Sequence, residues 1–192
     1  MITGEHYAEM DKLALSFLID YNLYHFPLNV FKIAEEILHA ELIKYSSLDS
    51  QQLEYIKSKE TLKKGFTITE RLANGDKRYK IFYNDEPNIY FQRFTIGHEI
   101  KHILLGEESF SNDSEILADY FSKALQAPKC LVISFGIFTQ EECIDMFSLG
   151  YESSGYWING VQKRILKYGK NLFDYERNYM NLYNDFNKNK KD

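Results

Sequence analysis

Residues 93–107, RFTIGHEIKHILLGE, carry the pattern that decides both the fold and the candidate site. His98 and His102 are four residues apart, and Glu99 directly follows the first histidine. On a helix, residues four apart project from the same face, so the two imidazoles can hold one metal ion. In this His-Glu-x-x-His arrangement the glutamate is placed to take a proton from a water molecule activated by the metal. The spacing therefore predicts a catalytic metal site on a helix over residues 91–105.

Apolar residues surround the two histidines on this predicted helix. They are Phe94, Ile96, Ile100, Ile103, Leu104 and Leu105. A helix this apolar is buried, and a polar side chain left without a partner inside it costs about 2–7 kcal/mol. A bound metal ion would satisfy both imidazoles, whereas the alternative is a pair of core histidines bonded to the backbone. The adjacent glutamate favours the metal.

A catalytic zinc ion needs a third protein ligand and an open fourth position. The extended pattern that ends in a third histidine is absent, because Leu105 stands at its glycine position and Glu108 at its histidine position. Glu107 and Glu108 are near in sequence, but a ligand there needs a sharp turn that Leu105 does not favour. Cys130 follows Pro128, which ends the next predicted helix. The third ligand is therefore expected elsewhere.

Glu115 is the preferred third ligand. It lies near the start of a predicted helix over residues 111–128 and can fold back toward the histidines, although the helix dipole alone also favours a carboxylate there. Asp119 lies one turn later on the same face, where it can accept the free N–H of a ligating histidine and so fix its tautomer. The residues thus predict His98, His102 and Glu115 as metal ligands, with Asp119 behind them.

The rest of the chain predicts an α+β fold in which helices dominate. Apolar spacing, caps and stops predict further helices over 6–21, 30–40, 139–148 and 156–168. Residues 47–63 have no clear pattern, 150–155 predict a turn, and the tail from residue 170 is expected to be helical in part at most and frayed.

Three β-prone segments predict a small antiparallel or mixed sheet. Residues 41–45 alternate as a short strand, and 65–72 and 77–84 predict a hairpin around an Asn-Gly turn. A strand edge beside the site would bind an extended peptide by strand addition. We take residues 79–84 as this edge, although they would equally close the sheet. The side chains expected to contact the peptide are Tyr79, Ile81 and Tyr83.

Composition narrows the classes of protein. The 192 residues, 44% of them hydrophobic, suit one domain or one domain with a small appendage. The net charge of −5 and the lack of a broad basic block argue against a nucleic-acid binder. Cys130 and Cys143 are expected to be ordinary buried thiols. Without a signal-like N-terminus or an apolar run of ~18 residues, we expect a cytoplasmic protein that contacts no membrane.

Residues 83–128 resemble the ImmA/IrrE family of metallopeptidases. That family has an Arg-Phe-Thr-x-x-His-Glu-x-x-His helix, followed by a Glu-x-x-Ala-Asn/Asp-x-Phe helix that ends at a proline. This chain keeps Tyr83-Asn84-Asp85, Arg93-Phe94-Thr95-Ile96, His98-Glu99, His102, Glu115, Ala118-Asp119, Phe121, Leu125 and Pro128. Lys101 stands where the family often has glycine, Ser122 where alanine is usual, and Gln126-Ala127 replaces Leu-Met. None of these departures removes a ligand or the base.

The resemblance implies a zincin-like metallopeptidase core over residues 1–130, with a C-terminal helical subdomain over 131–192 packed on it. It implies one zinc ion per chain, held by the three predicted ligands, with Glu99 as catalytic base. It also implies a site-specific endopeptidase that cleaves a cognate transcriptional repressor of a phage, mobile element or stress regulon.

Two other kinds of function stay open. Residues 139–168 can be read as a DNA-binding helix-turn-helix whose second helix carries Lys163, Arg164 and Lys167. The acidic net charge favours an ordinary helical pair instead, so direct DNA binding is not expected. A regulatory binding module that keeps the metal site without proteolysis is the other alternative. The residues also leave open manganese in place of zinc, the oxyanion donor (a tyrosine or His39), the substrate and the oligomeric state.

Overall fold

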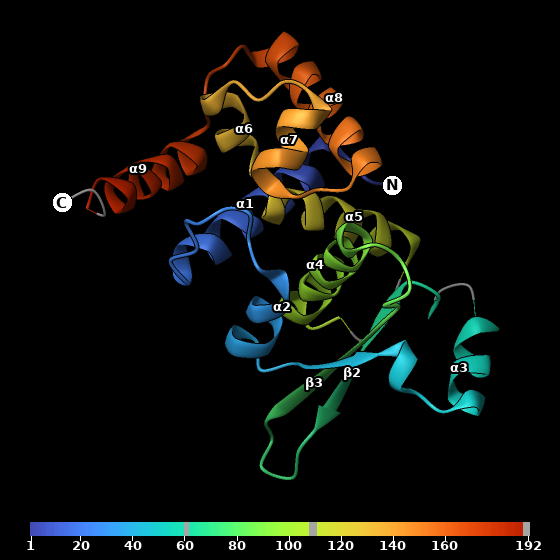
Figure 1. Ribbon diagram of the computed structural model, residues 1–192. Coiled ribbons are helices and arrows are strands. Elements are labelled where there is room, and N and C mark those ends of the chain that lie inside the picture. The colour runs from blue at the N-terminus through green and yellow to red at the C-terminus, as the bar shows by residue number, and fades with distance from the viewer. Residues whose placement is uncertain (60–61, 108–110, 190–192) are drawn as a thin grey trace. The chain divides into compact units, whose positions relative to one another are not determined.

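A computed structural model describes residues 1–59, 62–107 and 111–189 of the chain (Figure 1). Over these residues the protein is α+β, with nine α-helices and a three-stranded mixed sheet. The chain divides into two compact units, one formed by residues 29–122 and the other by 1–28 together with 123–192. This division differs from the expected boundary at residue 130, because the N-terminal helix packs with the C-terminal helices.

The sheet belongs to the unit of residues 29–122. It consists of β1 (Glu41–Lys44), β2 (Gly65–Arg71) and β3 (Lys77–Tyr83), in the order β1-β3-β2. β2 and β3 pair antiparallel through a tight turn in which Gly75 adopts φ +90°, so the predicted hairpin is confirmed. β1 joins β3 in parallel, with Leu42 opposite Ile81, which confirms the predicted strand at 41–45.

The expected edge strand is wrong. β3 is the central strand, because β1 pairs with one of its sides and β2 with the other. Ile81 and Tyr83 are buried, at 0% and 4% exposed, and pair with both neighbouring strands, while Tyr79 pairs with Thr69 of β2. Within the described residues, the outer edge nearest the candidate site belongs to β2.

Helix α4 (Ile89–Leu105) confirms the helix predicted over 91–105. The Asn88 side chain caps its start by accepting a hydrogen bond from the backbone N–H of Phe91 at 3.1 Å. Gly106 ends it with φ +62°, a left-handed conformation that glycine adopts without strain. α4 packs against β2 and β3 (Figure 1). Gly65 permits this packing, because an added Cβ would lie 2.5 Å from Thr95 Cγ2.

The remaining helices of this unit frame the sheet and the site. α2 (Val30–Lys32) continues as a π-helical segment over Ile33–Ile37, so the helix expected over 30–40 is shorter and irregular. α3 (Ser50–Lys57) lies in the stretch that had no clear pattern, and begins at an Asp49 capping box. α5 (Asn112–Gln126) confirms the helix that follows the histidines. The Ser122 hydroxyl ties α5 to α4 by donating to the Phe94 carbonyl at 2.8 Å.

The other unit is helical in all its regular elements that the structure describes. They are α1 (Gly4–Asp20), the end of α5, α6 (Lys129–Phe135), α7 (Gln140–Phe147), α8 (Tyr151–Tyr168) and α9 (Asp174–Lys188). α1 and α7 match their predictions. α8 starts at residue 151, so the turn expected over 150–155 is wrong. Gly155 suits that helix because its missing side chain leaves room for Gln140 of α7.

The tail is more helical than expected, because α9 covers Asp174–Lys188, whereas the frayed end expected there falls on residues 190–192, outside the described part of the chain. Tyr179 of α9 is fully buried and donates a hydrogen bond to the Leu23 carbonyl at 3.4 Å. The carboxylate of Glu176, which is 1% exposed, accepts hydrogen bonds from both terminal nitrogens of Arg164. These contacts order a segment whose composition alone predicts little structure. In the described part of the chain, no helix has the length and apolarity needed to cross a membrane.

Candidate metal centre

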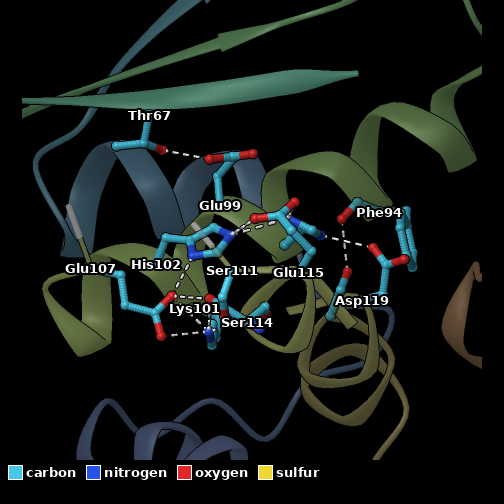
Figure 2. A network of polar contacts seen from close by, with 12 residues as sticks. Thr67, Phe94, Glu99, Lys101, His102, Glu107, Ser111, Ser114, Glu115 and Asp119 are labelled. Carbon is cyan, nitrogen blue, oxygen red and sulfur yellow. Dashed lines mark hydrogen bonds and ion pairs between the residues drawn. The ribbon is translucent and has the colours of Figure 1, made fainter. Parts of the chain in front are cut away.

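Helices α4 and α5 bring the three predicted ligands together. Nε2 of His98 lies 3.3 Å from one carboxylate oxygen of Glu115, and Nε2 of His102 lies 3.3 Å from the other. The two Nε2 atoms are 3.1 Å apart. Among the described residues, these three side chains form a group of donor atoms close enough to share one ion. Figure 2 shows Glu115 and His102 pointing toward the same place.

The donor atoms are close enough together to bind one metal ion. Two atoms that each lie 2.0–2.1 Å from a tetrahedral zinc ion are about 3.3 Å apart. The two Nε2 atoms, 3.1 Å apart, are close to this separation, and each lies 3.3 Å from a different oxygen of the Glu115 carboxylate. Two imidazoles and a carboxylate are also a common ligand set of catalytic zinc. The residues present therefore fit the ion that the sequence pattern implies.

Asp119 lies behind the first histidine, as the sequence predicts. Its Oδ1 is 2.8 Å from Nδ1 of His98. A carboxylate at this distance accepts the Nδ1 proton, so the lone pair of Nε2 is left for a metal. Burial lowers the pKa of His98, but the hydrogen bonds to Asp119 and Glu115 outweigh it and raise this pKa to about 9. The pocket thus favours positive charge at this point.

Glu107 has a role that the sequence analysis missed. The sequence disfavours it as a metal ligand, yet its Oε2 lies 2.6 Å from Nδ1 of His102. Burial lowers the pKa of His102 more than this contact raises it. Glu107 also binds Nζ of Lys101 at 2.7 Å through both carboxylate oxygens. Lys101 gave the available signal, because a lysine in an apolar helix requires a carboxylate partner.

Glu99 projects from α4 toward the sheet. Its side chain is buried, and Oε2 accepts a hydrogen bond from the Thr67 hydroxyl of β2 at 2.8 Å (Figure 2). Burial raises the pKa of Glu99 to about 7. A carboxyl group with such a pKa can both take and return a proton near neutral pH. Thr67 carried no signal in the sequence beyond its place on the hairpin.

Two cavities adjoin Glu99 and Glu115. The larger has a volume of about 290 Å³ and the smaller about 120 Å³. The larger is lined by Leu62, Gly65, Phe66, Glu99, His102, Ser111, Asn112 and Glu115. The smaller is lined by Lys64, Gly65, Phe94, Thr95, His98, Glu99, Glu115 and Asp119. Both therefore open along the start of β2, beside the convergent donors. Of the described residues, neither a tyrosine nor His39 lines either cavity.

In α8, the helix considered for DNA contact, one of the three basic residues is buried. Arg164 is 9% exposed and bound to Glu176, so its charge is not available to phosphate. Lys163 and Lys167 are exposed on α8. Two lysines on an acidic chain are a weak footprint for nucleic acid.

Most of the residues that carry the resemblance to ImmA/IrrE peptidases lie in α4 and α5. Among them, His98, His102 and Glu115 form the donor group, and Glu99 and Asp119 lie beside it. No protein-family model and no curated protein matches this chain, so its function has to be inferred from the geometry of these side chains.

Proposed function

We propose that this protein is a zinc-dependent endopeptidase with a zincin-like core. The observation that carries the proposal is the convergence of His98, His102 and Glu115, whose donor atoms are close enough to bind one ion, with Glu99 buried beside the histidines on α4. A purely structural cluster has no need of a fourth, protonatable carboxylate aimed at the adjoining cavities. A peptidase needs that group as its base.

Each of these side chains has a defined task in peptide hydrolysis. Zinc held by the three ligands would supply a Lewis acid that polarises the scissile carbonyl and lowers the pKa of water. Glu99 accepts a proton from the attacking water and returns it to the leaving amine. Thr67 holds one carboxylate oxygen of Glu99, so the other oxygen, Oε1, is the atom available for proton transfer. Asp119 holds the His98 ring in its ligating orientation.

The substrate would be an extended peptide that adds to the outer edge of β2. The first residues of β2, Gly65 and Phe66, line the cavities that flank Glu99. A peptide paired with this strand would therefore run past Glu99 and Glu115. This replaces β3, whose residues 80–83 are paired with a strand on both sides.

The biological substrate we propose is a cognate transcriptional repressor of a phage, mobile element or stress regulon, cleaved in the cytoplasm. Support comes from the motif resemblance over residues 83–128. An extended, accessible segment of that repressor would be the site of cleavage, because only an extended chain can pair with a strand edge.

The first experiment is elemental analysis of the purified protein and of Glu115→Ala. We expect one zinc ion per chain in the wild type and a large loss in the variant. Glu99→Gln is the matched control, which should keep zinc but lose cleavage of the repressor. A wild-type protein that takes up no zinc would overturn the proposal. Full biological function in Glu99→Gln would instead favour a binding module that keeps its metal.

A further inference from the structure

Lys101, Glu107 and Ser114 form a buried polar cluster next to the metal centre. Lys101 is 1% exposed within α4. Its Nζ donates to both carboxylate oxygens of Glu107 at 2.7 Å, to the Ser114 hydroxyl at 2.9 Å and to the Ser114 carbonyl at 3.3 Å. A charged group buried this deeply is stable only with such a set of partners.

The same cluster contacts the second histidine. Glu107 Oε2 lies 2.6 Å from His102 Nδ1 and accepts the Ser114 hydroxyl at 2.6 Å (Figure 2). A carboxylate only accepts hydrogen bonds, so the proton of His102 must be on Nδ1. Nε2 then presents its lone pair toward His98 and Glu115.

The cluster also reaches the helix of the third ligand. Ser114 directly precedes Glu115 at the start of α5, and Lys101 and Glu107 hold Ser114 through its hydroxyl and carbonyl oxygens. Gly106 makes this possible, because its left-handed turn lets the Glu107 N–H bond to the His102 carbonyl at 3.0 Å. Glu107 is thereby folded back against the last turn of α4.

We propose that Glu107, held in place by Lys101 and Ser114, is a positioning residue for the metal centre that fixes the His102 tautomer and the approach of Glu115. Asp119 does the same for His98 from the other side, so each ligating histidine has its own carboxylate. Partners of this kind typically change metal affinity by about 10- to 100-fold when removed. This inference rests on the proposed zinc site but not on peptidase activity.

The test is zinc affinity, measured by competition with a chromophoric chelator in variants that remove the cluster in steps. Lys101→Met keeps Glu107 on His102 and serves as the reference. Adding Glu107→Ala to it removes the acceptor without leaving Lys101 unpaired, and should weaken zinc binding about 10- to 100-fold. Adding Glu107→Gln instead supplies an amide oxygen that can still accept from Nδ1, and should restore part of the affinity.

A matched control separates positioning from general stability. Glu70 and Lys80 form an ion pair of the same 2.7 Å length and line neither cavity. Lys80→Met/Glu70→Ala should leave zinc affinity within about twofold of the wild type, since it touches no ligand. Equal zinc affinity for Lys101→Met with and without Glu107→Ala, with only a lower melting temperature, would overturn the inference and leave the endopeptidase proposal intact. Tight zinc binding that depends on Glu107, in a protein without peptidase activity, would support the inference and overturn the endopeptidase proposal.

A second readout does not depend on the variants folding. The zinc-loaded wild type should show an NMR resonance for a hydrogen-bonded Nδ1 proton of His102. A proton on Nε2 instead would overturn the inference directly.

Discussion

Replacing Gly65 by alanine should separate β2 from α4 and destabilise the protein. An alanine Cβ would lie 2.5 Å from Thr95 Cγ2 and 2.9 Å from the Phe82 carbonyl oxygen. Carbon atoms in contact prefer about 3.5–4.0 Å, so the strand must move by roughly 1 Å. Overpacking of this kind costs about 1–3 kcal/mol. For chains of 150–250 residues each kcal/mol shifts the melting temperature by about 2–4 °C, so we expect a fall of about 2–12 °C.

The shift should also reach the catalytic base. Thr67 lies two residues along β2 from Gly65 and holds Glu99 through a 2.8 Å hydrogen bond. A displacement of about 1 Å would break that bond, so Gly65→Ala should lose peptidase activity while it keeps its zinc. Thr95→Ser removes the clashing methyl group. In the double variant it should recover part of the stability, because the contact with the Phe82 carbonyl remains.

Gly160→Ala provides the control for Gly65→Ala. Gly160 lies exposed inside α8, and an added Cβ meets nothing within 4 Å. The same substitution should stabilise the protein there by about 0.4–1 kcal/mol, because alanine is the better helix former. Thermal unfolding followed by circular dichroism should show a lower melting temperature for Gly65→Ala and a higher one for Gly160→Ala than for the wild type. A Gly65→Ala protein as stable as wild type would refute the close approach of β2 to α4.

Three further predictions follow from other contacts. Glu176→Gln should cost about 3–5 kcal/mol of unfolding free energy in urea titrations, because it leaves Arg164 buried without its anion; a loss below about 1 kcal/mol would contradict this. Zinc at 100 times its dissociation constant should stabilise the wild type by about 2.7 kcal/mol, reversed by a chelator, and Glu115→Ala should show a much smaller gain. Cys130 and Cys143 should resist iodoacetamide at pH 7 until the chain is unfolded, because burial raises the pKa of both thiols, that of Cys143 to about 11; rapid labelling of the native protein would exclude this.

The regular elements nearest the histidines could be predicted because local signals agree there. The spacing of the two histidines and the apolar residues around them predict α4, and the Asn-Gly turn predicts the hairpin. The position of β3 in the sheet could not be predicted in the same way. Whether a hairpin strand lies at an edge depends on whether a distant strand pairs with it, and β1 does so from more than thirty residues away. That contact is tertiary and leaves no periodic signal.

The C-terminal tail shows the same limit from another direction. Its composition is polar, which predicts a partial helix at most, but Tyr179 and Met180 of α9 are buried. The sequence alone suggests that the Glu176 carboxylate is exposed to solvent. In the structure it accepts hydrogen bonds from Arg164 instead. A polar sequence can therefore form an ordered helix when a few of its residues find partners elsewhere in the chain.

The two carboxylates behind the histidines, Asp119 and Glu107, differ in how far the sequence could predict their positions. Asp119 could be predicted because it shares a helix face with Glu115, and helical periodicity places both toward the first histidine. Glu107 could not, because its direction depends on the left-handed turn at Gly106, which reverses the chain just beyond the helix. The sharp turn that Leu105 does not favour is made by Gly106 instead, and it folds the Glu107 carboxylate back onto His102. Lys101, which replaces the glycine often found in the resembled family, is the cation that keeps this carboxylate ionised and in place. Burial raises the pKa of Glu107, but the hydrogen bonds from Lys101, Ser114 and His102 hold this pKa below its usual value.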